Sequence, residues 1–223
     1  MTNTPISART LLRETFATAG PLYAPLLIIN SPSLIFFALN SLDSLGSAGV
    51  AINIIYWLVA FPLLSGAMIF YTYRSLTRNQ VTVGQAFNQA NRRLLQLIGV
   101  SLMCFLLVFA GCIALIIPGL YVSYRLMFSF YATVIDNSSV IDSLSSSWEL
   151  TKGRWWLVFR SSILIVFVVS VPILLIVLLI SSTGNLLASK LAGNVLGFFT
   201  VPLMNVYLVL LYLRLRDSAA IIK

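Results

Sequence analysis

The sequence contains no histidine and only six acidic residues among its 223 positions. The side chain most often used as a general base, a metal ligand or a pH switch is therefore missing. The carboxylates lie far apart along the chain, and no nucleophile stands at a recognisable spacing from a base. We expect no catalytic residues, no metal site and no cofactor, and a protein that is not an enzyme.

Cysteine is also scarce, with Cys104 and Cys112 as the two examples. Their spacing within one apolar run places them about 12 Å apart along a helix axis. Because a disulfide cannot bridge that distance, we expect both to pack as apolar residues.

Charged residues make up only 9% of the chain, whereas hydrophobic residues make up 59%. A soluble domain carries about 25% charged and about 45–50% apolar residues. With a mean hydropathy of +0.97, a soluble monomer of this size could not bury its apolar surplus, so that class is excluded. The composition predicts an all-α, polytopic membrane protein in which residues 1–223 form a single integral membrane domain.

Six apolar runs reach or approach the length of about 20 residues that a spanning helix needs. We expect transmembrane helices at residues 22–39, 48–73, 94–117, 120–135, 155–181 and 191–213. The third and fifth runs are the clearest. The first is interrupted by Pro25, Asn30 and Pro32, and the fourth is short and contains Arg125.

The net charge is +8, and the basic residues flank the apolar runs. Of the 14 basic residues, all except Lys190 and Arg125 fall on or near the side that holds both ends of a six-span chain. The positive-inside rule then places both termini in the cytoplasm, and a five-span model fits less well. The expected partners of these charges are anionic lipid headgroups, not nucleic acid. Arg9 and Arg13 are followed by Glu14 without a signal-peptide pattern, so we expect the N-terminus to be retained.

Two connections on the opposite side are expected to be short. Residues 40–47 join the first two spans, and Ile117-Pro118-Gly119 forms a tight turn between the third and fourth. Proline cannot continue a helical ladder and glycine permits positive φ, so we expect a close helical hairpin here.

Three polar segments on the cytoplasmic side are expected to be interfacial amphipathic helices. They cover residues 7–19, 82–92 and 139–152. Thr82 and Gln85 match a capping box, and Ser139 with Asp142 offers an acidic variant of the same arrangement.

Aligned on these caps, the segments predict a threefold repeat in which each unit is one amphipathic helix followed by one helical hairpin. Five residues after each cap stand Leu12, Phe87 and Leu144. The first unit has two candidate starts. One is Ser7, and the other is Thr4 with Pro5, because proline suits the first helical position.

The third amphipathic segment carries one apolar stripe, formed by Ile141, Leu144 and Trp148. The stripe suits either insertion into the headgroup region of the membrane or docking on the ends of the spanning helices. The sequence leaves both alternatives open.

Aromatic residues near the span ends are expected to anchor the chain at the membrane interface. We assign this role to Trp148, Trp155 and Trp156. Gly153 is expected to end the preceding amphipathic helix, because glycine adopts the left-handed conformation without a Cβ penalty.

Arg125 is the one charge that cannot be placed in or near a loop on either side of the membrane. An arginine near the bilayer centre costs about 2.5–3.5 kcal/mol on insertion scales. Its guanidinium therefore needs water, a lipid phosphate, or polar side chains such as Asn30, Asn53 or Asn205. Two interpretations stay open: snorkelling with hydrogen bonds to carbonyls freed near Pro118, or contact between Arg125 in the bundle interior and an anionic lipid headgroup or ligand.

Two further stretches carry a family resemblance. They are Ile117-Pro-Gly-Leu-Tyr-Val-Ser-Tyr-Arg125 and Asp142-Ser-Leu-Ser-Ser-Ser-Trp148-Glu-Leu-Thr-Lys-Gly153-Arg-Trp-Trp156. Over about 40 residues the chain resembles the membrane domain fused to some bacterial glycerophosphoryl diester phosphodiesterases, and its stand-alone relatives of uncharacterised function. The resemblance implies a six-span protein of the bacterial cytoplasmic membrane, or another internal energy-transducing membrane. It does not imply phosphodiesterase activity, because that chemistry belongs to a separate soluble barrel that this chain lacks.

The sequence favours a non-enzymatic scaffold or accessory subunit that binds lipid, or another membrane protein or complex. The alternative is a transporter or permease-like carrier of a small or anionic solute, which Arg125 and the proline-interrupted spans would suit. Proton or sodium coupling normally uses buried carboxylates, and the spans offer none in a central position. An intramembrane enzyme is the third alternative. The oligomeric state is not predicted.

Overall fold

The computed structural model describes residues 7–40, 46–77 and 79–220, and within them every regular element is a helix. The helices are α1 (Ala8–Asn30), α2 (Pro32–Asn40), α3 (Gly46–Ile55), the π-helical η2 (Tyr56–Ala60), α4 (Phe61–Leu76), α5 (Val83–Arg92), α6 (Leu94–Ala114), α7 (Ile116–Leu126), α8 (Ser129–Ile135), α9 (Val140–Thr151), α10 (Trp155–Ser181) and α11 (Leu186–Ala220). The Thr4-Pro5 start, most of the predicted 40–47 connection and both chain termini lie outside the described residues.

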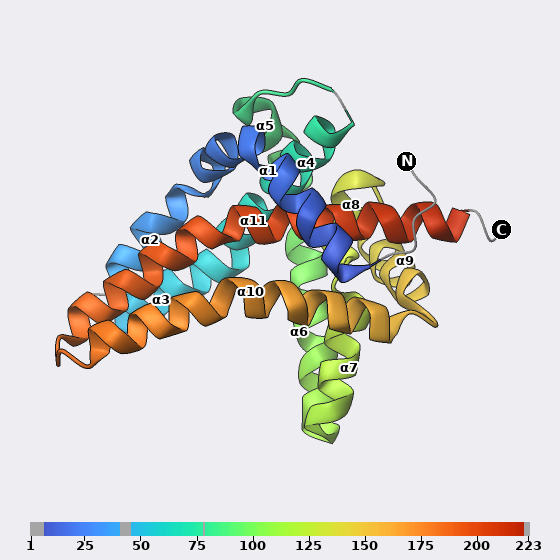
Figure 1. Cartoon of the computed structure of the whole chain (residues 1–223). Coiled ribbons are helices and arrows are strands. Elements are labelled where there is room, and N and C mark those ends of the chain that lie inside the picture. The colour runs from blue at the N-terminus through green and yellow to red at the C-terminus, as the bar shows by residue number, and fades with distance from the viewer. Residues whose placement is uncertain (1–6, 41–45, 78, 221–223) are drawn as a thin grey trace.

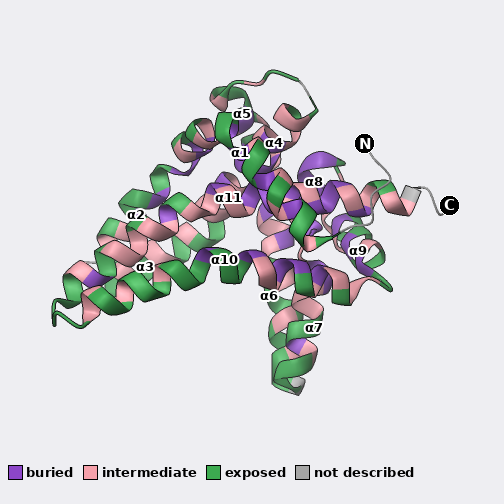
Figure 2. Cartoon of the chain, viewed as in Figure 1, coloured by how far each residue is buried: buried purple, intermediate pink, exposed green. Residues whose placement is uncertain are grey.

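The helices extend from a common core as separate arms (Figure 1). The α10–α11 hairpin forms one long arm with α2 and α3 beside it, and the α6–α7 hairpin points in another direction. Helices α5 and α9 lie away from the tips of both hairpins. Buried residues concentrate where α1, α4, α8 and α11 meet, whereas the hairpin arms are mostly exposed (Figure 2). Such apolar, exposed arms suit a lipid environment.

The predicted class of all-α polytopic membrane protein is confirmed. Four helical stretches are long and apolar enough to cross a membrane: Gly46–Leu76, Leu94–Ile113, Trp155–Ser181 and Leu186–Ala219. A fifth candidate is the pair of Ala8–Asn30 and Pro32–Leu39, which is bent by 52°. The predicted span 155–181 coincides with α10.

The expectation that the fourth span is continuous over residues 120–135 is wrong for the described chain. Helix α7 ends at Leu126, and the seven-residue α8 begins at Ser129. Every residue of α8 except Phe130 is buried in the protein, so its apolar character reflects the core and not contact with lipid. A run of apolar residues does not by itself distinguish these two environments.

The predicted α6–α7 hairpin forms, but its turn is at Leu115 and not at Ile117-Pro118-Gly119. Pro118 occupies the first turn of α7, where a missing N–H costs no helical hydrogen bond. Gly119 has no positive φ. Instead it lets the two helices touch, since a Cβ on Gly119 would lie 2.9 Å from the Cys112 backbone nitrogen.

Two of the three amphipathic segments begin at their predicted caps. Thr82 and Gln85 form the complete capping box of α5, and the Ser139 hydroxyl accepts from the Asp142 N–H at the start of α9. Helix α9 ends at Thr151, and Gly153 follows with φ of +69°, which confirms its expected role.

The first unit departs from the proposed repeat. Helix α1 begins after Ser7, whose side chain makes no cap hydrogen bond, and it continues to Asn30 through Pro21 and Pro25. The amphipathic part and the first part of the predicted span are therefore one helix. In the other two units a short break separates the amphipathic helix from the next long helix.

Ion pairs attach the last turns of α11 to the core. Arg214 Nη2 lies 2.6 Å from Glu14 Oε1, and Arg216 Nη1 lies 2.8 Å from Asp136 Oδ1. The Tyr212 hydroxyl also donates to Asp136. These contacts join α11 to α1 and to the end of α8.

Candidate functional site

The break between α7 and α8 is closed by a serine from α9. Ser147 Oγ donates to the Arg125 carbonyl oxygen at 2.7 Å and accepts from the Phe128 N–H at 3.1 Å. Both backbone groups lose their helical partners where α7 ends. One hydroxyl therefore replaces two helical hydrogen bonds, and it fixes the backbone that carries Arg125.

Ser147 belongs to a buried polar face of α9 that also contains Ser143 and Thr151. The Ser143 hydroxyl lies 2.8 Å from the Thr133 hydroxyl of α8, and the Thr151 hydroxyl lies 3.4 Å from the Arg125 carbonyl oxygen. The polar face of α9, with its spacing of four residues, is thus the face that packs against the protein.

The apolar stripe of α9 consequently faces outward. Ile141 is 76% exposed and Trp148 is 37% exposed, whereas Leu144 is half-buried. Docking uses the serines and also the Trp148 ring, which lies over Arg125, so Ile141 is the part of the stripe most available to the membrane interface.

Arg125 is buried beneath two aromatic rings, and only 4% of its surface is exposed. Its Cζ lies 4.2 Å from the centroid of the Trp148 ring and 5.7 Å from that of the Tyr121 ring. Cation–π contacts of this kind contribute about 0.5–2 kcal/mol. Within the described chain no carboxylate lies at ion-pair distance from Arg125.

Two buried N–H donors in this cluster have no hydrogen-bond acceptor among the described residues: Arg125 Nε and Trp155 Nε1. Arg125 and Trp155 share Tyr121 as a neighbour. The centroid of the Tyr121 ring lies 5.7 Å from the centroid of the Trp155 ring. A buried donor without an acceptor costs about 1–3 kcal/mol. We call Tyr121, Arg125, Trp148 and Trp155 the Arg125 cluster.

The cluster offers positive charge and hydrogen-bond donors but no carboxylate, so its chemistry suits an anion. A guanidinium binds phosphate and carboxylate oxygens in a planar, two-pronged geometry. The indole N–H can only donate, and aromatic rings with one polar atom are typical of the membrane interface.

The structure brings together three of the four residues that the sequence assigns to sites. Arg125, Trp148 and Trp155 lie around Tyr121 in the cluster, whereas Trp156 is 66% exposed and contacts the cluster through Trp155. Tyr121 was missed, although its position four residues before Arg125 places both on one helix face.

The three asparagines considered as partners of Arg125 bind elsewhere. Asn30 Nδ2 donates to the Phe198 carbonyl at 3.4 Å, Asn53 Nδ2 donates to the Gly49 carbonyl, and Asn205 accepts from Thr72. The snorkelling interpretation is also not observed, because the guanidinium is covered by protein.

Comparison with known proteins gives one family. The family model described as a domain of unknown function (DUF7847) matches residues 80–215, which include α5 to most of α11 and the whole Arg125 cluster. No curated protein and no solved structure matches the chain. Since the family model covers more than half of the sequence, the chain belongs to the DUF7847 family.

Proposed function

We propose that this protein is a non-enzymatic scaffold or accessory subunit of its membrane, and that it holds an anionic lipid headgroup at the Arg125 cluster. The supporting observation is the buried Arg125 side chain, whose Nε has no acceptor and which shares the neighbour Tyr121 with Trp155, whose indole N–H also has no acceptor among the described residues. A lipid phosphate is an acceptor that suits the guanidinium. A second membrane protein bearing an acidic group is the other partner that this chemistry suits.

The proposed membrane is a bacterial cytoplasmic membrane or another internal energy-transducing membrane, with both chain ends in the cytoplasm. Helices α5 and α9 then lie on the cytoplasmic face, and the outward apolar stripe of α9 inserts at the membrane interface. The excess of basic residues near these helices supports this orientation.

Cysteine labelling tests the orientation. In a protein lacking Cys104 and Cys112, we expect a cysteine at Ser146 to react with an impermeant maleimide only after the cells are permeabilised. A cysteine at Thr183, at the α10–α11 turn, is expected to react in intact cells. The reverse pattern would contradict the proposed orientation.

The alternative function of a carrier is favoured by one observation, the 52° bend between α1 and α2. Broken helices in carriers expose backbone groups that bind solute or ions. Here Ser31 Oγ donates to the Ile28 carbonyl at 2.8 Å, and Ser33 Oγ donates to the Asn30 carbonyl at 2.7 Å. Because the freed carbonyls are occupied within the chain, we retain lipid binding as the proposal.

Lipid-dependent stability tests the Arg125 cluster directly. We expect phosphatidylglycerol, but not phosphatidylcholine, to raise the thermal midpoint of the detergent-solubilised protein. At 100 times its dissociation constant a bound lipid stabilises the folded state by about 2.7 kcal/mol. We expect Arg125→Gln to remove most of this gain and Arg125→Lys to remove part of it, because lysine keeps the charge but not Nε. Arg13→Gln, at an exposed arginine of α1, is the matched control.

Arg125→Met separates ligand binding from a purely structural role. If Arg125 exists to bind an anion, its removal takes away a buried charge without a partner, and the lipid-free protein should gain about 1–3 kcal/mol of stability. A marked loss of stability without lipid, together with an unchanged response to phosphatidylglycerol, would show that Arg125 only packs under Trp148.

A further inference from the structure

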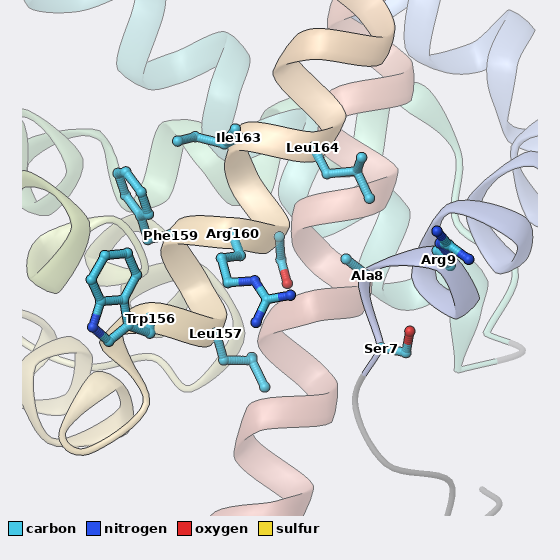
Figure 3. Close-up of a pocket in the computed structure, with 10 residues that line it drawn as sticks. Ser7, Ala8, Arg9, Trp156, Leu157, Phe159, Arg160, Ile163 and Leu164 are labelled. Atoms are coloured by element: carbon cyan, nitrogen blue, oxygen red, sulfur yellow. The ribbon is translucent and has the colours of Figure 1, made fainter.

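A cavity of about 670 Å³ lies between the start of α1 and the first three turns of α10. Its principal lining residues are Arg9, Trp156, Leu157, Phe159, Arg160 and Leu164. Figure 3 shows the Arg160 side chain extending from α10 toward Ala8, with the Arg9 side chain on the other side of Ala8. The cavity is adjacent to the Arg125 cluster, because the rings of Trp156 and Phe159 contact the Trp155 ring, but Arg125 itself does not line it.

Two cations at the cavity have no partner within the described chain. No ion pair or side-chain hydrogen bond joins Arg9 or Arg160 to another described residue. By contrast, Arg154 Nη1 donates to the Leu215 carbonyl at 3.2 Å, and Arg93 Nη1 donates to the Asn137 carbonyl at 3.1 Å. Both side chains are exposed, so the cavity carries two arginines that are available to bind an anion.

The position of Arg160 adds to this argument. It lies five residues into α10, about 7.5 Å along the axis from Trp155, and α10 continues as an apolar span to Ser181. A charge at that depth in a membrane needs a polar partner or a path to the headgroups. Lipid phosphates lie at the same level as the tryptophans that mark an interface.

The remaining walls favour an acyl chain. Leu157, Phe159 and Leu164 are carbon-rich, and the lining of the cavity exposes much more apolar than polar surface. A small free anion would leave these walls without contact, whereas an amphiphile satisfies both the arginines and the apolar walls.

We propose that this cavity binds one anionic phospholipid, with its phosphate at Arg160, on the side of the cavity that Arg9 also lines, and one acyl chain along Leu157 and Leu164. The inference rests on the proposed lipid-binding function and adds a second site to it. The bound lipid would join the start of α1 to α10 on the cytoplasmic side.

The test counts and locates bound lipid. We titrate the purified full chain with phosphatidylglycerol carrying a photoreactive diazirine on one acyl chain, and read lipid stoichiometry by native mass spectrometry. We expect two tightly bound lipids and cross-links on the α10 peptide around Leu157 and Leu164. Arg9→Gln/Arg160→Gln should remove one lipid and those cross-links, with its affinity weakened at least about tenfold.

Arg13→Gln/Arg92→Gln, at two exposed arginines outside the cavity, should change neither readout. Arg125→Gln should remove the other lipid and keep the α10 cross-links, so failure at the cavity is distinguishable from failure of the proposed function. Unchanged cross-links in Arg9→Gln/Arg160→Gln would overturn the inference. So would displacement of the lipid by millimolar inorganic phosphate, because a free anion would then be the ligand.

Discussion

Replacing Ser147 by alanine is expected to destabilise the protein by about 2–4 kcal/mol. The Ser147 hydroxyl bonds both the Arg125 carbonyl and the Phe128 N–H, and each unpaired buried backbone group costs about 1–3 kcal/mol. Water cannot replace the hydroxyl readily, because Ser147 and Phe128 are almost completely buried. The measurement is the free energy of unfolding, or the thermal midpoint, in a fixed detergent.

Two serines on the same helix provide the control. Ser145 and Ser146 are exposed on α9, and their replacement by alanine should change stability by less than about 0.5 kcal/mol. If Ser147→Ala is as mild as Ser146→Ala, the hydroxyl does not hold the break between α7 and α8.

The second large effect is expected at Gly119, where α6 and α7 touch. In Gly119→Ala the new Cβ would lie 2.9 Å from the Cys112 nitrogen and 3.1 Å from its Cα. Backbone atoms cannot move aside as a side chain can, so the helices must separate. We expect a loss of about 3 kcal/mol or more, at or above the upper end of the usual cost of overpacking.

Gly197→Ala is the matched control, since nothing lies within 4 Å of a Cβ at that position in α11. Cys112→Ala should rescue Gly119→Ala only in part, because it removes the sulfur but keeps the backbone contact. Equal stability of Gly119→Ala and Gly197→Ala would show that the hairpin is looser than described.

Local sequence signals predicted local structure well. The caps at Thr82 and Ser139, the end of α9 at Gly153 and the full extent of α10 all depend on neighbouring residues in the chain. Such features are set by backbone hydrogen bonds and φ preferences, which the sequence shows directly.

Features that depend on distant contacts were not predictable in the same way. The 120–135 run has the hydrophobicity of a span, yet it is divided because Ser147, from another helix, caps the break. Likewise, Arg125 meets the ring of Trp148 through the docking of α9. Neither contact leaves a signal in the local sequence. The resemblance to the phosphodiesterase-fused membrane domain stays a prediction.

The central claim is that the protein holds an anionic lipid at the Arg125 cluster. The most direct measurement is lipid class analysis of the wild-type protein and of Arg125→Gln, each purified in mild detergent from the same membranes. We predict that wild-type protein retains anionic phospholipid well above its share of the source membrane, and that Arg125→Gln loses at least one equivalent per chain. Lipid bound to both proteins in the proportions of the source membrane would contradict the account.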